Sequence, residues 1–128
     1  MELGERTAAL KASLDATRGA VGEVRSFRSG SPPSVIIYKV MEKMFAILSV
    51  RGTENVILKC DPLLAEILRE QYDGVGHRSH LDRRYWISVN LDSDVPAEEI
   101  DRLAAHSYEQ VCATLTRKQK AELAALTS

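Results

Sequence analysis

Three apolar runs rich in β-branched residues follow one another near the middle of the chain, at residues 34–40, 43–50 and 55–60. Each has the length of a single strand, and only the short segments Met41-Glu42 and 51–54 separate them. Connections this short join antiparallel neighbours, because a parallel crossover needs about a dozen residues. The pattern therefore predicts an antiparallel meander at the centre of the fold.

Helical periodicity flanks this meander. Apolar residues recur at helical spacing over 5–20, and the pair Asp61-Pro62 is a typical helix start before 62–72. A third helix is expected to open at Asp94. The apolar stripe of the second helix consists of Leu64, Ile67, Leu68 and Tyr72. The core face of the third helix consists of Ile100, Leu103, Ala104, Tyr108, Val111 and Leu115.

The remaining segments complete an α+β class. Alternation over 85–91 predicts a fourth strand that directs Tyr85 with Ile87 to one face and Trp86 to the other. Residues 25–34 and 74–84 are expected to form loops, and a short strand is the alternative for 74–84. Thr116-Arg-Lys-Gln119 resembles a capping box opening a last helix to about residue 126. We expect a small antiparallel sheet of hairpins packed against N- and C-terminal helices.

Chain totals exclude several classes of protein. The 128 residues fit a single domain, and 45% hydrophobic content is ordinary for a globular chain. Two cysteines, Cys60 and Cys112, suit buried free thiols better than a disulfide framework. Without an apolar signal run or a membrane-length apolar stretch, a cytoplasmic location is expected.

Catalytic and metal-binding patterns are weak. No nucleophile elbow or phosphate-binding loop occurs, and Glu98-Glu99 are better explained as acids in the first turn of a helix. His77 and His80 lie near Asp82, but the neighbouring arginines would repel a cation. We therefore expect a protein that is not an enzyme and that holds no metal or cofactor.

Charge is distributed unevenly although the net charge is only −1. Basic residues dominate 25–60 and 74–90, which are mostly strand segments, and acidic residues dominate the helical segments 61–73 and 91–128. The segment from His77 to Trp86 combines arginines, histidines and aromatics, side chains that contact phosphates and stack on bases. The alternative is that Trp86 packs beneath a helix and the arginines form a solvated edge.

Several short motifs together resemble one known family. Their order and spacing over 35–112 are similar to the MmcQ/YjbR family, and the matching pieces are Lys39-Val40, Lys43-Met44-Phe45-Ala46, Leu58-Lys59-Cys60-Asp61-Pro62, His80-Leu81-Asp82-Arg83-Arg84-Tyr85-Trp86 and His106-Ser107-Tyr108. The resemblance implies a CyaY-like (frataxin-like) fold for a single domain over 1–128, with 116–126 as a C-terminal helical extension. It also implies a similarity to the double-wing DNA-binding domain of a phage factor.

The resemblance further implies a site for double-stranded DNA. The wings would be the hairpins at Met41-Glu42 and Arg51–Thr53, although the family usually has Gly-Gly where this chain has Met41-Glu42. The residues expected to contact DNA are Lys39, Lys43, Lys59, His80, Arg83, Arg84 and Trp86.

Two alternatives remain open at this point, as does the oligomeric state. The same basic face would serve a module that binds an acidic protein or a small anion, and a narrow pocket lined by His80, Arg84 and Trp86 would favour this reading. A weaker idea follows from the frataxin-like fold, in which acidic helices bind iron. The available acids are Glu66, Glu70, Asp73, Glu98, Glu99 and Asp101.

Overall fold

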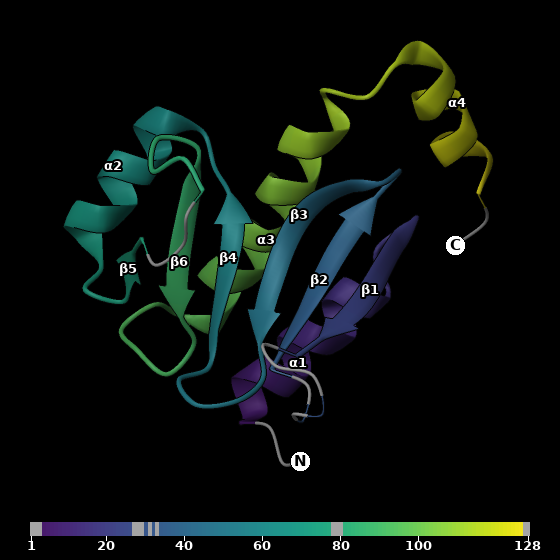
Figure 1. Ribbon diagram of the computed structural model, residues 1–128. Helices are drawn as coiled ribbons and strands as arrows, with labels where there is room; N and C mark the ends of the chain where they lie inside the picture. Colours follow the sequence, from purple (N-terminus) through teal and green to yellow (C-terminus); the bar gives the residue numbers. More distant parts are fainter. Residues whose placement is uncertain (1–3, 27–29, 31, 33, 78–80, 127–128) are drawn as a thin grey trace.

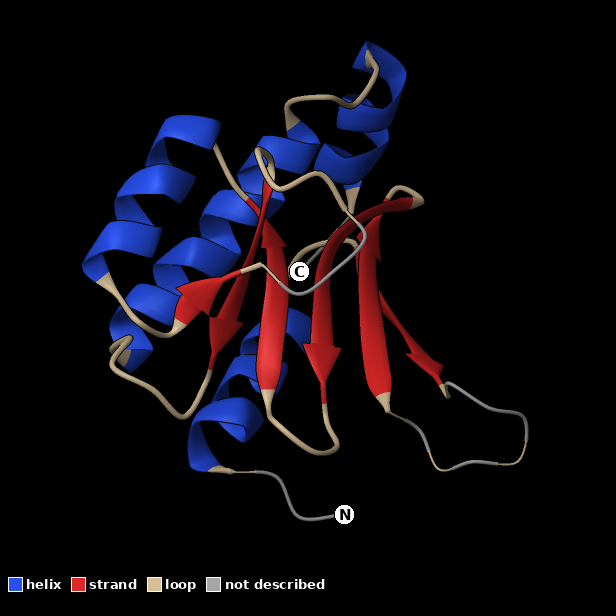
Figure 2. Cartoon of the chain, turned by 60° about the vertical axis from the view of Figure 1, so that its left-hand side comes forward, coloured by secondary structure: helices blue, strands red, loops and turns tan. Residues whose placement is uncertain are grey.

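The protein folds into one antiparallel sheet with its helices on one face (Figures 1 and 2). The computed structural model describes residues 4–26, 30, 32, 34–77 and 81–126. The strands form a six-stranded sheet in the order β1-β2-β3-β4-β6-β5. In chain order the elements are α1 (Glu5–Asp15), β1 (Ala20–Arg25), β2 (Val35–Val40), β3 (Lys43–Ser49), β4 (Asn55–Lys59), α2 (Pro62–Gln71), β5 (Val75–Gly76), β6 (Trp86–Asn90), α3 (Ala97–Cys112) and α4 (Arg117–Ala125).

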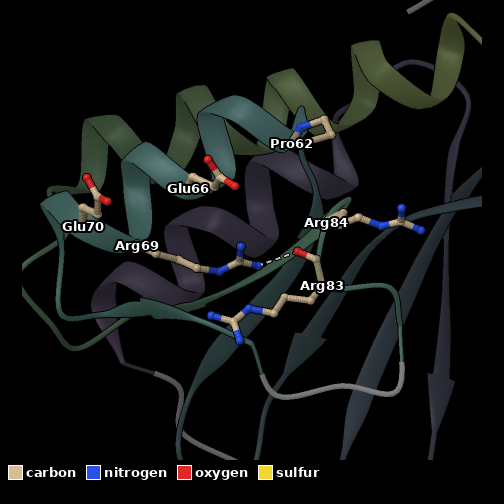
Figure 3. Close-up of a pocket in the computed structure, with 6 residues that line it drawn as sticks. All are labelled: Pro62, Glu66, Arg69, Glu70, Arg83 and Arg84. Carbon is tan, nitrogen blue, oxygen red and sulfur yellow. Dashed lines mark hydrogen bonds between the residues drawn. The ribbon is translucent and has the colours of Figure 1, made fainter.

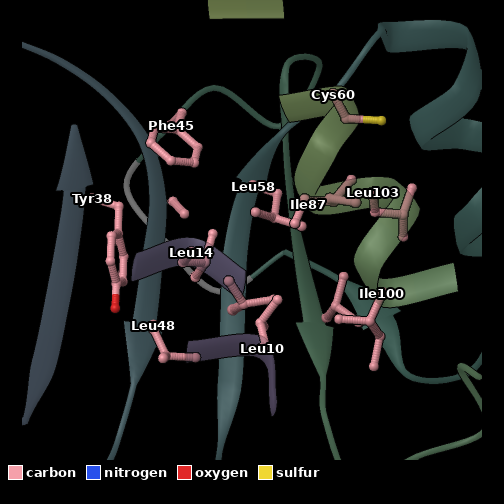
Figure 4. Packing of buried hydrophobic residues seen from close by; sticks show 14 of the residues in the cluster. Leu10, Leu14, Tyr38, Phe45, Leu48, Leu58, Cys60, Ile87, Ile100 and Leu103 are labelled. Carbon is pink, nitrogen blue, oxygen red and sulfur yellow. The ribbon is translucent and has the colours of Figure 1, made fainter. Parts of the chain in front are cut away.

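The predicted meander is confirmed, and its alternation decides which side chains enter the core. In β2, Ile36, Tyr38 and Val40 are buried toward the helices, while Ile37 and Lys39 lie on the opposite face, which we call the open face. The core between sheet and helices is continuous, as Figure 4 shows for a selection of its members. Burial of this apolar surface is the main force that holds the layers together.

A β-bulge in the centre of the sheet adds an aromatic group to this core. Tyr38 pairs with Ala46 and Lys39 pairs with Met44, so Phe45 has no partner in β2. Phe45 is fully buried, and its ring lies 6.4 Å from that of Tyr38 and edge-on to that of Tyr108 at 5.4 Å. The bulge therefore connects β3 to α3.

Helix starts follow the predicted local chemistry at two positions. The Asp61 carboxylate accepts hydrogen bonds from the backbone N–H groups of Leu63 and Leu64, and proline occupies the first turn of α2. Thr116 and Gln119 form the reciprocal capping box of α4. By contrast, α3 begins at Ala97 rather than at Asp94, because the Asp94 carboxylate accepts from the N–H groups of Asp73 and Gly74 instead.

The N-terminal segment differs from the prediction. Helix α1 ends at Asp15 rather than near residue 20, and residues 20–25 form β1, an unpredicted strand beside β2. Gly19 turns the chain with a φ of +73°. A Cβ on Gly22 would lie 3.1 Å from side-chain atoms of both Ile36 and Tyr38, so the glycine leaves room for these two buried side chains. Local propensity was overridden by pairing with a distant strand.

Two side chains that the sequence placed on apolar faces are exposed. Ile67 is 50% exposed, so it lies outside the buried side of α2, which is formed by Ala65 and Leu68. Tyr85 is 41% exposed, because β6 begins one residue later, at Trp86. The other proposed core residues of α2 and α3 are buried or partly buried against the core.

The turn between β2 and β3 has an unusual backbone. Met41 and Glu42 have φ values of 49° and 70°, the left-handed region that glycine adopts most readily. Two consecutive residues with positive φ are the signature of a tight hairpin turn that matches the twist of the flanking strands. The turn type that Gly-Gly would favour is thus retained here by two residues that carry side chains.

Candidate functional site

One end of the sheet collects the basic residues. Strands β2 and β4 end there and β3 and β6 begin there, because neighbouring strands are antiparallel; we call it the upper end, as in Figure 1. Six of the seven residues predicted to contact DNA lie at this end or within three residues of it, and the seventh, His80, lies outside the described residues. The six are Lys39, Lys43, Lys59, Arg83, Arg84 and Trp86.

The balance of basic and acidic residues differs between the two ends of the sheet. Among the described residues, the β3–β4, α2–β5 and β6–α3 turns at the opposite, lower end of the sheet carry Arg51 against several acids, and Arg25 ends β1 at the same end. These acids are Glu54, Asp73, Asp92 and Asp94. In the described part of the chain, the upper end of the sheet is therefore more basic than these lower turns.

Trp86 belongs to the open face. It pairs with Lys59 across β4 and β6, and the next residue, Ile87, is fully buried toward the helices. Trp86 itself is half-buried. The alternative that Trp86 packs beneath a helix is therefore wrong, and the half-buried indole lies on the open face next to Lys59 in the sheet.

The predicted cations differ in how they are held. Lys39 Nζ lies 3.3 Å from a Glu23 carboxylate oxygen, and Lys43 Nζ donates to the carbonyl and hydroxyl oxygens of Thr114 at 3.0 and 3.1 Å. Among the described residues, Lys59 and Arg83 make no ion pair or hydrogen bond through their side-chain nitrogens. These two cations are consequently the ones available to an anion without breaking a contact.

Arg84 is neutralised locally. Its guanidinium donates two hydrogen bonds to the Asp82 carboxylate, at 2.9 and 3.2 Å, and lies 5.4 Å from the centre of the Tyr85 ring. The hydrogen bonds lower the pKa of Asp82 and raise that of Arg84. Arg84 must exchange this partner before it can bind a phosphate.

Arg69, to which the sequence assigned no role, is bonded to the backbone of the segment before β6 that contains Arg83 and Arg84. Its Nη2 donates to the carbonyl oxygens of Arg83 and Trp86, at 2.7 and 2.9 Å, and so ties α2 to the start of β6. Burial and then the nearby Arg83 charge lower the pKa of Arg69. Nothing in the sequence distinguished Arg69 from a solvated helix residue.

A pocket of about 570 Å³ lies between α2 and the segment before β6 that contains Arg83 and Arg84 (Figure 3). In Figure 3 the Arg83 side chain runs beside the Arg69 guanidinium, while Arg84 points the other way. No ion pair links any two of the charged residues in the lining. Arg69 Nε is buried without a hydrogen-bond partner among the described residues. The lining residues are Pro62, Glu66, Arg69, Glu70, Arg83 and Arg84.

This pocket differs from the one that would favour the small-anion reading. Arg84 lines it, but Trp86 is absent from the described lining, and His80 lies outside the described residues. Arg69 and Arg83 take their place. Guanidinium groups bind compact anions through paired hydrogen bonds, and here Glu66 and Glu70 lower the potential on the α2 side of the two guanidiniums.

The His106-Ser107-Tyr108 motif has a structural role. The fully buried Ser107 hydroxyl accepts the N–H of Lys59 at 2.8 Å and donates to the carbonyl of Phe45 at 2.5 Å, which bridges β3 and β4 where their direct pairing stops. His106 Nε2 accepts the Asp61 N–H at 3.2 Å, and Tyr108 donates to the Arg18 carbonyl at 2.7 Å. The motif fixes α3 against the upper end of the sheet.

The hairpins expected to act as wings lie at opposite ends of the sheet. The β2–β3 turn is at the upper end, and the β3–β4 turn, with Arg51, is at the lower end, because successive turns of a meander alternate. Only the first hairpin therefore lies beside the basic residues.

The thiols and the acidic residues offer no second site. Both cysteines are free, and burial raises the pKa of the Cys60 thiol to about 11, while Cys112 is only half-buried. Within the described residues, no three histidine, cysteine or acidic side chains gather in a way that would hold a metal ion. In the same part of the chain, no helix is both long and apolar enough to cross a membrane.

Together, the fold and the site define a class of small α+β protein: an antiparallel sheet with helices on one face and a basic strand end beside an arginine-lined pocket. A family model described as YjbR matches residues 16–110. The chain belongs to the YjbR family, which confirms the resemblance drawn from its short motifs.

Similar proteins agree with this assignment. YjbR of Escherichia coli K12 is 35% identical over 83 residues, which cover 64% of this chain and 70% of that protein, and YjbR of Escherichia coli O157:H7 matches equally well. The crystal structure of Deinococcus radiodurans protein DR2400, a DUF419 domain, has a TM-score of 0.79 at 25% identity and covers 91% of this chain and 86% of that one. A Pseudomonas syringae protein, with a TM-score of 0.62 at 19% identity over 86% and 98% of the two chains, shares the fold.

Proposed function

We propose that this YjbR-family protein is a non-enzymatic, cytoplasmic DNA-binding protein that contacts the phosphates of a duplex with the upper end of its sheet. One observation carries the proposal: cations from three strands and from the segment before a fourth meet at one end of the sheet, next to a half-buried tryptophan. Phosphate contacts by Lys and Arg supply most sequence-independent affinity for DNA.

The contacts described above rank the residues of this interface. Lys59 and Arg83 bind phosphates first, because neither gives up an existing partner. Lys39 and Arg84 contribute less, because each exchanges a carboxylate for a phosphate. Arg69 holds the backbone at Arg83 and Trp86, so this part of the interface is ordered before DNA arrives.

The interface uses one hairpin rather than two. The β2–β3 turn and the segment before β6 approach the duplex together, while the β3–β4 turn points away from it. Glu42, at the tip of the first turn, keeps the phosphate backbone at a distance from the turn itself. The phosphates therefore lie over Lys59 and Arg83.

Fluorescence anisotropy with a labelled mixed-sequence duplex, measured at low and near-physiological salt, tests the proposal. Each phosphate contact contributes about 0.9 to the slope of log affinity against log salt. The double variant Lys59→Ala with Arg83→Ala should bind more weakly, with a slope smaller by about 2. The matched control, Lys11→Ala with Arg51→Ala, removes the same two kinds of charge from α1 and the lower end and should bind normally.

Trp86 provides an internal reporter, because it is the single tryptophan of the chain. Its emission should change on titration with unlabelled DNA and should respond less in the Lys59/Arg83 variant. Equal affinity for the variant and the native protein, or no binding at low salt, contradicts the proposal. Binding with unchanged Trp86 emission would remove Trp86 from the interface.

The pocket between α2 and the segment before β6 favours a second candidate function, the binding of a small multivalent anion. Two neighbouring guanidiniums, of Arg69 and Arg83, are unpaired with any described carboxylate. Calorimetric titration with pyrophosphate tests this candidate. Arg83→Ala should abolish binding and Glu70→Gln should strengthen it, whereas no heat of binding to the native protein rejects the candidate.

A further inference from the structure

Strand β1 leaves one edge of the sheet open in the part of the chain that the structure describes. It pairs with β2 on one side, and no described strand lies on its other side. Val21 and Val24 are 61% and 54% exposed, and the strand contains neither lysine nor proline. Natural proteins usually protect such an edge, since its free N–H and C=O groups pair readily with another strand.

The backbone of β1 is oriented for pairing. The Arg25 carbonyl accepts from the Ser34 N–H on the β2 side. Residues alternate in the direction of their backbone groups, so Gly22 and Val24 direct theirs outward. In agreement, the Arg25 guanidinium reaches the Val24 carbonyl, at 3.5 Å. Within the described residues no strand pairs with these outward groups, and a second strand would replace the long Arg25 contact to the Val24 carbonyl.

The side chains of β1 restrict which strand fits. Glu23 and Arg25 lie on the open face, where their side chains form an ion pair at 2.7 Å, and Val24 lies on the helix face. If a second β1 pairs so that Glu23 opposes Glu23, like charges meet. A shift of one residue on each strand places Val24 opposite Val24 and Glu23 opposite Arg25 on both sides, which suits antiparallel pairing.

We propose that a second copy of this chain pairs with β1, with Val24 on the two-fold axis and Glu23 against Arg25 of the partner subunit. The ion pair that each strand makes within itself is then also made across the interface. The two sheets become one continuous sheet whose open faces lie on the same side and whose upper ends point in opposite directions. Each upper end stays accessible, so dimerisation and DNA binding are separable.

Light scattering coupled to size-exclusion chromatography, repeated over a wide concentration range, tests this inference. The native chain should approach the dimer mass as concentration rises. Glu23→Arg alone and Arg25→Glu alone should each weaken the dimer about tenfold or more, because two like-charge pairs replace two attractive ones. The double variant should restore it, and Val24→Lys should leave a monomer.

Thermal unfolding of dilute samples shows whether each variant still folds, which matters because Glu23 also contacts Lys39. The proposal is overturned by a native chain that is monomeric at every concentration, by a Val24→Lys dimer, or by a folded double variant that stays monomeric. Variants of Lys59 and Arg83 should dimerise normally, so a failed DNA interface and a failed dimer give different results.

Discussion

Replacing Ser107 by alanine tests whether the link between β3, β4 and α3 depends on a single hydroxyl. That hydroxyl takes the place of a direct hydrogen bond between the Lys59 N–H and the Phe45 carbonyl. Alanine keeps the helical backbone and the small volume but leaves one donor and one acceptor without a partner. Phe45 and Ser107 are both fully buried, whereas Lys59 is half-buried, so water reaches the Lys59 N–H more readily than the Phe45 carbonyl.

The expected cost follows from these two groups. An unsatisfied buried donor or acceptor costs about 1–3 kcal/mol, and partial access of water to the Lys59 N–H brings the sum to about 2–4 kcal/mol. An unfolding entropy of about 2.1 cal/mol/K per residue applies to the 128 residues of the chain. The melting temperature of Ser107→Ala should therefore fall by about 7–15 °C.

Thermal and urea unfolding measure this loss, with Ser88→Ala as the control. Ser88 is also buried, at 4% exposure, but its hydroxyl makes no hydrogen bond to another described residue. Its replacement should cost less than about 1 kcal/mol. If both variants melt at the same temperature, the Lys59 N–H and the Phe45 carbonyl form a direct hydrogen bond in Ser107→Ala, and the hydroxyl is dispensable.

Two further predictions concern the turns. Glu42→Gly should stabilise the protein by about 0.5–1 kcal/mol in urea unfolding, because relief of the left-handed conformation outweighs the added chain entropy, whereas Glu42→Val should destabilise it. Hydrogen bonds from Asp73 and Gly74 lower the pKa of Asp94, so the stability it adds is full above about pH 4 and is lost as pH falls through its lowered value. Asp94→Asn should therefore melt below the Asp92→Asn control at pH 7, and the gap should close in acid; a gap that persists refutes the linkage.

Most of the fold was available from the sequence because its signals are local. The lengths and alternation of 34–60 determine three strands and their antiparallel order, and the caps at Asp61 and Thr116 determine where two helices begin. The basic residues around these strands were also visible, because charge can be read without coordinates. Their meeting at one end of the sheet follows from the alternating direction of the strands.

Only the tertiary structure decided the features that depend on distant partners. Residues 20–25 follow a helical pattern that Gly19 and Gly22 break, and they become a strand only because β2 pairs with them. Arg69 resembles a solvated helix residue until the carbonyls of Arg83 and Trp86 lie within reach. Which cations remain available likewise depends on Glu23, Thr114 and Asp82 as neighbours in space. Periodicity reports on backbone contacts a few residues apart, whereas pairing, burial and ion pairs form between segments that the fold alone brings together.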